Sequence, residues 1–210
     1  MFGISNFEWF LISSILLNIT PGADTMYIVS KSISQGKRAG IYSALGISSG
    51  AIVHTLLAAF GLSVILMKSV MLFNVVKILG AGYLIYLGIR MLLEKKNKVS
   101  DQGSLDKMTN KKIFLQGLIT NVTNPKVALF FLAFIPQFID PGSSSPIPFL
   151  MLGLTFTMTG GVWCTLIALF SSLVTKGLRD SSNVQFLLNK LTSIVFIAMG
   201  IKLFKTKATA

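Results

Sequence analysis

Charged side chains are scarce in this sequence. Asp, Glu, Lys and Arg make up 12% of the 210 residues, while 52% are hydrophobic; soluble domains usually carry about 25% charged residues. The chain therefore leaves almost nothing for a water-soluble domain. Cysteine and histidine occur once each, as Cys164 and His54. This excludes a disulfide framework and a cysteine-based metal cluster, and we expect no bound metal and no cofactor.

The apolar residues lie instead in six long runs. A helix needs roughly 20 apolar residues to cross a bilayer core about 30 Å thick, and each run is near or above that length. No Lys or Arg precedes the first run, so we expect a retained span rather than a signal peptide. The sequence predicts an all-α membrane protein with six transmembrane helices, whose runs are Phe7–Val29, Ile41–Leu66, Val70–Leu93, Ile113–Ile139, Ile147–Val174 and Phe186–Phe204.

The net charge of +12 does not indicate a nucleic-acid partner, because the basic residues gather in short loops between the runs. Lys and Arg in such loops favour the cytoplasmic side of a membrane. Of the 19 basic residues, 13 lie on one side of a six-span chain and 4 on the other, with Lys77 and Lys126 inside spans. This count predicts three cytoplasmic loops and both termini outside. A five-span alternative with a re-entrant first segment would move the N-terminus inside.

The one extended polar stretch, Glu94–Lys112, is charged and contains Gly and Ser, which is typical of a flexible cytoplasmic linker. It separates residues 1–93 from residues 113–210, and three motifs of the first half recur in the second half in the same order. "NITPGAD" is echoed by "NVTNPKV", "GAIVHTLLAAF" by "GGVWCTLIALF", and "LGIRML" by "MGIKLF". Each half holds three spans, an odd number, so the halves are expected to cross the membrane in opposite senses. The prediction is a pair of inverted-topology repeats of the kind found in alternating-access transporters.

Both repeats carry a proline break within a span. Pro21 and Pro125 each remove a backbone donor and crowd the carbonyl four residues back, so we expect the first and fourth helices to be broken. In inverted-repeat transporters the substrate site lies near such paired interruptions. A simple proline kink is the alternative for each break taken alone. The paired breaks predict a substrate-binding or gating site formed by Asn18, Thr20, Pro21, Gly22, Asp24, Asn121, Thr123, Asn124, Pro125 and Lys126.

Two of these residues place charges inside the membrane, where each costs about 2.5–3.5 kcal/mol on insertion scales. Asp24 can bind an ammonium group or carry a proton, and Lys126 with the amides after Pro125 can bind a carboxylate. Together they would suit a zwitterion such as an α-amino acid. The alternatives are a structural salt bridge between the two residues and a gating role for Asp24. His54, within an otherwise apolar span, is a second candidate for a proton relay, or a packing histidine.

Glycines within the spans favour close helix packing. Gly46 and Gly50 fit the nucleophile-elbow pattern G-x-S-x-G, which requires a strand–turn–helix context. On a membrane helix they more plausibly let two backbones approach. Gly80, Gly82 and Gly88 in the third run suggest the same use.

Two stretches, "PGADTMYIVSKSISQGKRAGIYSALGISSG" and "TNPKVALFFLAFIPQF", resemble the LysE/RhtB family of bacterial amino-acid exporters, and "GAGYLIYLGIRML" resembles that family's third span. The first motif usually reads P-G-P-D in the family; here Ala23 replaces the second proline and Asp24 is kept. The resemblance implies a multi-pass protein of the bacterial inner membrane that exports an amino acid by proton antiport. Pro21, Gly22 and Asp24, with Asn124, Pro125 and Lys126, match the family motifs. Few further acids lie within spans, which favours a neutral substrate such as homoserine, threonine or leucine.

Other functions fit the sequence less well. A metal-ion exporter would need several carboxylates or clustered soft ligands, and an exporter of another small solute stays open. An intramembrane enzyme would need a unit such as Ser48 or Ser49 with His54, whose spacing on one helix is poor for contact. A channel is a further alternative. No ATP-binding signature is present, so we expect secondary transport, and a homo-oligomer stays open.

Overall fold

The computed structural model describes residues 3–64, 70–93, 108–140 and 145–171, with eight further residues between 190 and 204. All regular elements within these residues are helices, apart from one isolated antiparallel bridge between Ile4 and Ile139. The predicted all-α class is therefore confirmed for the described chain. Most of the sixth predicted run and residues 94–107 of the predicted linker lie outside the described residues.

The helices follow the apolar runs, with shifted ends. The first run forms two helices, so that its second helix extends six residues beyond the predicted end at Val29, and the fourth span begins within the predicted linker, at Asn110. The elements are α1 Phe7–Ile19, α2 Ala23–Gln35, α3 Lys37–Leu57, the π-helical turn η1 Ala58–Leu62, α5 Val70–Leu93, α6 Asn110–Val122, α7 Pro125–Leu129, the π-helical turn η2 Phe130–Phe134, the 3₁₀ turn η3 Ile135–Phe138, and α8 Ile147–Leu169.

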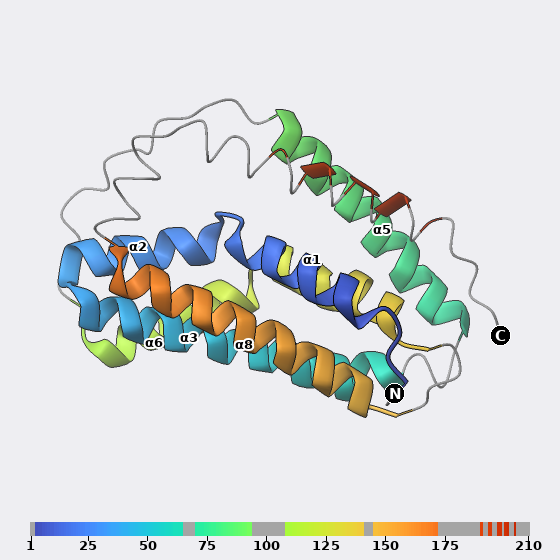
Figure 1. Cartoon of the computed structure of the whole chain (residues 1–210), viewed down its shortest axis with the longest axis horizontal. Coiled ribbons are helices and arrows are strands. Elements are labelled where there is room, and N and C mark those ends of the chain that lie inside the picture. The colour runs from blue at the N-terminus through green and yellow to red at the C-terminus, as the bar shows by residue number, and fades with distance from the viewer. Residues whose placement is uncertain are drawn as a thin grey trace.

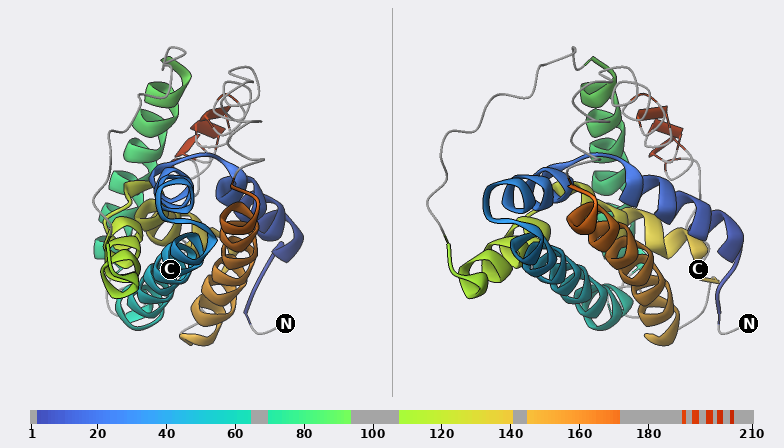
Figure 2. Two further views of the ribbon diagram at one scale, coloured as in Figure 1. Left: turned by 90° about the vertical axis from the view of Figure 1, so that its left-hand side faces the viewer. Right: turned by 60° about the vertical axis from the view of Figure 1, so that its left-hand side comes forward.

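α3 is central to the arrangement. It packs against α6, α8 and α2, while α1 packs against α8. In both views of Figure 2, α3 lies between α6 and α8. α5 lies at a slant to this bundle and contacts α7 and η2 (Figure 1). Among the described elements, α2 packs against α3, α6 and α8, which matters for the site described below.

Two described helices are long and apolar enough to cross a membrane, Lys37–Leu62 and Ile147–Leu169. The pair Asn110–Val122 and Pro125–Phe138, bent by 46°, adds a third if it forms one span. Large apolar side chains point outward from these helices; Met158 is 72% and Val162 64% exposed. Soluble proteins rarely expose contiguous apolar surface on this scale, so the fold is that of a membrane protein.

Glycines bring α3 and α6 into backbone contact. A Cβ added to Gly46 would lie 2.2 Å from the main-chain oxygen of Phe114, and one added to Gly117 would lie 2.8 Å from that of Ser43. The predicted close packing at Gly46 and Gly50 is thus confirmed. For Gly82 the same prediction is wrong within the described chain, because none of its atoms lies within 4 Å of an added Cβ there.

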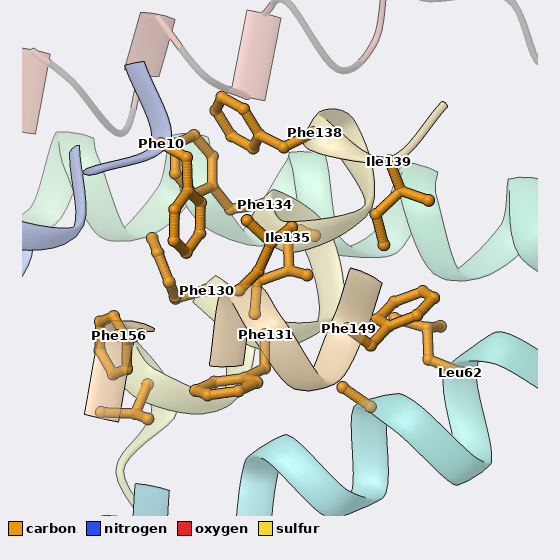
Figure 3. Close-up of a cluster of buried hydrophobic side chains, with 14 of the residues drawn as sticks. Phe10, Leu62, Phe130, Phe131, Phe134, Ile135, Phe138, Ile139, Phe149 and Phe156 are labelled. Carbon is orange, nitrogen blue, oxygen red and sulfur yellow. The ribbon is translucent and has the colours of Figure 1, made fainter. Parts of the chain in front are cut away.

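Phenylalanine rings fill the space between the broken fourth span and its neighbours. Phe130 stacks on Phe156 with ring centroids 4.5 Å apart, and Phe10 meets Phe138 edge-on at 5.4 Å (Figure 3). Aromatic pairs of this kind contribute about 0.5–1.5 kcal/mol beyond their buried area. This cluster joins α1, the turns η2 and η3, and α8.

Equivalent positions of the two sequence halves contact one another reciprocally. Gly50 on α3 packs against Asn121, and its counterpart Gly160 on α8 packs against Asn18, the counterpart of Asn121. Each glycine thus packs against the asparagine of the other half.

The third motif shows the same exchange. A Cβ on Gly88 would meet Ile197 and the main-chain oxygen of Ser193, and a Cβ on Gly200 would meet Ile85 and the main-chain oxygen of Ala81. The glycine, the isoleucine and the residue whose main-chain oxygen is contacted, Ala81 or Ser193, keep the same spacing in both halves.

Candidate functional site

The first apolar run is interrupted after α1, whose C-terminal cap is Thr20. The Thr20 hydroxyl donates to the Leu16 carbonyl at 2.7 Å, and the Thr20 amide donates to the same oxygen at 3.1 Å. Pro21 and the extended Gly22 then separate α1 from α2. Since Pro21 has no N–H, the carbonyl four residues back, that of Leu17, loses its helical partner.

Lys126 replaces that partner from the other half of the chain. Its Nζ donates to the carbonyl of Leu17 at 3.2 Å and to that of Thr20 at 3.0 Å. A cation at the C-terminal end of a helix is also favoured by the helix dipole. Gly22 packs against Lys126, since a Cβ there would lie 3.3 Å from Nζ. Lys126 therefore caps α1.

The second break repeats this design. Thr123 donates its hydroxyl to Ile119 at 2.8 Å, as Thr20 does to Leu16. Pro125 removes the donor four residues beyond the carbonyl of Asn121. That oxygen accepts instead from the Asn124 amide at 3.0 Å, and the His54 Nε2 atom lies 3.2 Å from it. Since a carbonyl only accepts, Nε2 is the donor. The Asn124 side chain accepts from the Lys126 amide at 3.0 Å and caps α7. An amide that was predicted to bind a carboxylate thus has an internal partner.

Asp24 lies in the first turn of α2, where the positive end of the helix dipole favours a carboxylate. Its Oδ2 accepts from Asn121 Nδ2 at 2.8 Å, which joins α2 to α6. The other oxygen, Oδ1, is buried and has no hydrogen-bond partner within the described chain, and the same holds for Asn121 Oδ1. Two acceptor atoms are thus left open on one hydrogen-bonded pair.

No ion pair joins Asp24 to Lys126, although both lie in the described part of the chain: the hydrogen bonds of Lys126 Nζ go to carbonyls and that of Asp24 to an amide. Each charge instead complements the end of a half-helix, the start of α2 for Asp24 and the end of α1 for Lys126. A hydrogen bond to a charged group contributes about 1.5–3 kcal/mol. These contacts are of the size needed to offset the insertion cost of each charge.

The broken ends surround a small cavity of about 30 Å³. That volume holds water but not an amino acid. Asp24 is the one acidic residue among its described lining residues. The polar residues of the wall are Asn18, Asp24, Thr25, Ser48, Asn121, Lys126, Thr157 and Cys164. Its apolar residues are Ile47, Ala51, Val127, Phe156, Gly160 and Gly161.

The structure thus brings four of the predicted site residues, Asn18, Asp24, Asn121 and Lys126, to one cavity. Asn18 also donates to Thr159 Oγ1 at 3.1 Å and thereby fixes α1 on α8. The remaining predicted residues flank the cavity and shape the two breaks. They are Thr20, Pro21, Gly22, Thr123, Asn124 and Pro125.

His54 is not among the lining residues of the cavity. Its ring stacks on that of Phe131 at 5.5 Å, and the side chain is 7% exposed. It is linked to Asp24 only through Asn121, by the main-chain oxygen on one side and the side-chain amide on the other. In the described chain no hydrogen bond joins His54 to Ser48 or Ser49; the Ser49 hydroxyl donates to Leu45 within its own helix.

Sequence reasoning missed the wall that α8 contributes. Phe156, Thr157 and Gly161 line the cavity opposite Asp24. The signal was present in the repeat, since the motif that begins at Gly50 on α3 recurs at Gly160 on α8. The capping of α1 by Lys126 was also missed, because only the folded chain brings Lys126 to the carbonyls of Leu17 and Thr20.

Comparison with known protein families gives a match over most of the chain. The family of LysE type translocators matches residues 15–207. This chain belongs to the LysE family. The predicted resemblance is confirmed, and the protein is a transporter rather than an enzyme.

Similar proteins extend over nearly the whole of this LysE family chain. It is 32% identical to an uncharacterized membrane protein of Bacillus subtilis, YrhP, over 89% of this chain and 92% of that one. It is 30% identical to a leucine efflux protein of Klebsiella pneumoniae and 29% identical to one of an Enterobacter species, each over 96% of both chains. No solved structure matches the chain.

Proposed function

We propose that this protein exports a neutral amino acid across the bacterial inner membrane, with leucine as the first candidate. The observation that carries the proposal is the pair of open acceptors in the cavity, Asp24 Oδ1 and Asn121 Oδ1. The ammonium group of an amino acid supplies the donors that these oxygens lack. Membership of the LysE family and the leucine efflux relatives support the same substrate class.

The rest of the cavity suits the other parts of such a substrate. Lys126 Nζ makes two hydrogen bonds and has a third N–H available for a carboxylate. Ile47, Val127 and Phe156 provide apolar surface for an aliphatic side chain. A dibasic substrate would need a second carboxylate, and the described wall has none besides Asp24.

The transport cycle we propose rests on two inverted repeats, residues 1–93 and 113–210, with six spans and the basic loops in the cytoplasm. The reciprocal contacts of Gly50 with Asn121 and of Gly160 with Asn18 support a pseudo-two-fold relation between the halves. So does the capping of each proline-freed carbonyl by a side chain of the opposite half. Rocking of one repeat against the other would expose the cavity to each side in turn.

Proton antiport follows from a competition at Asp24. Its free oxygen can hold either a proton or the substrate ammonium group, but not both. A substrate that leaves toward the outside would be replaced by a proton, which is released on the cytoplasmic side. The carboxylate then exchanges one positive charge for another in each half-cycle, and it is never left uncompensated in the membrane.

The test is counterflow in proteoliposomes with a panel of labelled amino acids. We expect exchange of leucine and of similar neutral amino acids. Lysine and arginine should exchange little, because the described cavity wall has no acid besides Asp24 for a second ammonium or guanidinium group. An inward proton gradient should drive net export. Failure of every amino acid on the panel would contradict the proposed substrate class.

His54→Gln separates a proton relay from a structural role. Glutamine keeps an N–H for the Asn121 carbonyl but does not titrate. Because His54 is absent from the cavity wall, we expect counterflow and proton-driven export both to be retained, within about twofold. Loss of driven export with intact counterflow would instead make His54 an obligatory relay.

A further inference from the structure

Three side chains on one face of α2 hold the start of α6. Tyr27, Lys31 and Gln35 are spaced four residues apart, so they lie in line along the helix. The Tyr27 hydroxyl donates to the Ile113 carbonyl at 2.8 Å. Lys31 and Gln35 both hold Met108, just before α6 begins. We call this contact the α2–α6 seam, and these are the residues that define it.

Lys31 is poorly matched by its partners in the seam. It is 4% exposed, yet the acceptor of its Nζ is the Met108 sulfur at 3.0 Å, and the Tyr27 ring lies 5.7 Å away. A thioether is a weak acceptor. No carboxylate contacts Lys31 within the described chain. A buried ammonium without an anionic partner is an unfavourable arrangement.

Gln35 adds a second unmatched donor at the same place. Its Oε1 accepts from the Met108 amide at 2.9 Å, while its Nε2 is buried without a partner in the described chain. Lys31 and Gln35 therefore both contact Met108, and neither Lys31 Nζ nor Gln35 Nε2 has a strong acceptor in the described chain. A carboxylate has four lone-pair sites and would satisfy both.

From this arrangement we propose that Lys31 and Gln35 form a second binding site, specific for the carboxylate of an amino acid, which opens the seam by displacing the Met108 side chain. The inference rests on the proposed function for the identity of its ligand. Lys31 lies seven residues beyond Asp24, about 10 Å along α2. The site would thus precede the cavity on the path from the linker side, and Met108 would act as its plug.

In the described chain, the bonds of the seam residues to α6 and Met108 all lie near the start of α6, at Met108, Ile113 and Gln116. Tyr27 and the Met108 contacts join α2 to α6 at the linker end, whereas the Asp24–Asn121 bond joins them at the cavity. A carboxylate gives Lys31 a stronger acceptor than sulfur. A carboxylate that binds Lys31 more tightly when the seam is open therefore shifts the protein toward the open seam.

Accessibility of position 108 tests the inference. Met108→Cys in solubilised protein is labelled with a water-soluble maleimide, with leucine, with leucinamide and without ligand. The parent protein, whose one cysteine is buried, gives the background. We expect leucine to accelerate labelling about tenfold or more, as a charge-assisted bond is gained. Leucinamide, which lacks the carboxylate, should have no effect.

Lys31 variants and a matched position complete the design. Lys31→Gln in the Met108→Cys protein should abolish the difference between leucine and leucinamide, and Lys31→Arg should keep it. Ser34→Cys, on the exposed face of α2, should be labelled equally with and without ligand. In transport, Lys31→Gln should raise KM for leucine more than it lowers the maximal rate. Lys37→Gln, which removes an exposed lysine nearby, should change KM by less than about twofold.

The outcomes separate this inference from the proposed function. If leucine leaves labelling at position 108 unchanged, or if leucinamide matches leucine, the carboxylate site is wrong whatever counterflow shows. If labelling responds as expected while counterflow fails for every amino acid, the site stands and the export function falls.

Discussion

Asp24→Asn is expected to abolish amino-acid exchange without unfolding the protein. The side-chain oxygen of the introduced asparagine can still accept from Asn121, so the α2–α6 bond of 2.8 Å persists. The ammonium group of the substrate, however, loses its buried charge partner. Removing one member of such a pair costs about 2–5 kcal/mol, so counterflow should fall on the order of 100-fold or more.

The measurement is counterflow of labelled leucine beside thermal unfolding of the purified variant. We expect the melting temperature to stay the same or to rise, because an intramembrane charge has been removed. Asp140→Asn is the matched control, since Asp140 follows η3 and is not part of the cavity wall. Full counterflow by the Asp24→Asn protein would refute the role given to this carboxylate.

Gly46→Ala is expected to destabilise the protein although alanine is the better helix former. Propensity alone would favour alanine by about 1 kcal/mol. At Gly46 the added Cβ would lie 2.2 Å from the main-chain oxygen of Phe114, and a backbone atom cannot turn aside as a side chain can. α3 and α6 must therefore separate, at a cost of about 1–3 kcal/mol or more.

Gly82→Ala is expected to change the stability of the protein in the opposite direction. No atom of the described residues lies within 4 Å of a Cβ at Gly82, so we expect only the propensity gain, and the melting temperature should rise or stay unchanged. Thermal unfolding of both variants in the same detergent makes the comparison. A Gly46→Ala protein as stable as Gly82→Ala would show that α3 and α6 are not in backbone contact.

The two intramembrane charges illustrate a broader point about proline breaks. A proline frees a carbonyl and creates two new helix ends, one of each polarity. In this protein a lysine takes the freed carbonyl of Leu17, and a carboxylate takes the positive start of α2. Each charge is held by a helix end, so neither has to pair with the other.

Local chemistry explains what the sequence by itself determined. Long apolar runs predict membrane helices, and a residue without an N–H interrupts a helix wherever it lies, so the class and both breaks follow from the order of residues. The order of the motifs predicted a repeat and made Asn18, Asp24, Asn121 and Lys126 candidates for one site.

Tertiary structure alone decided how these residues are used. Lys126 meets Leu17, and Asn121 meets Asp24, across about 100 residues of chain, and no periodicity encodes which face of one helix meets which face of another. The same holds for the α8 wall and for the contact between Lys31 and Met108. These contacts depend on glycine positions that set how closely α3, α6 and α8 approach, a property of several helices packed together rather than of any one segment.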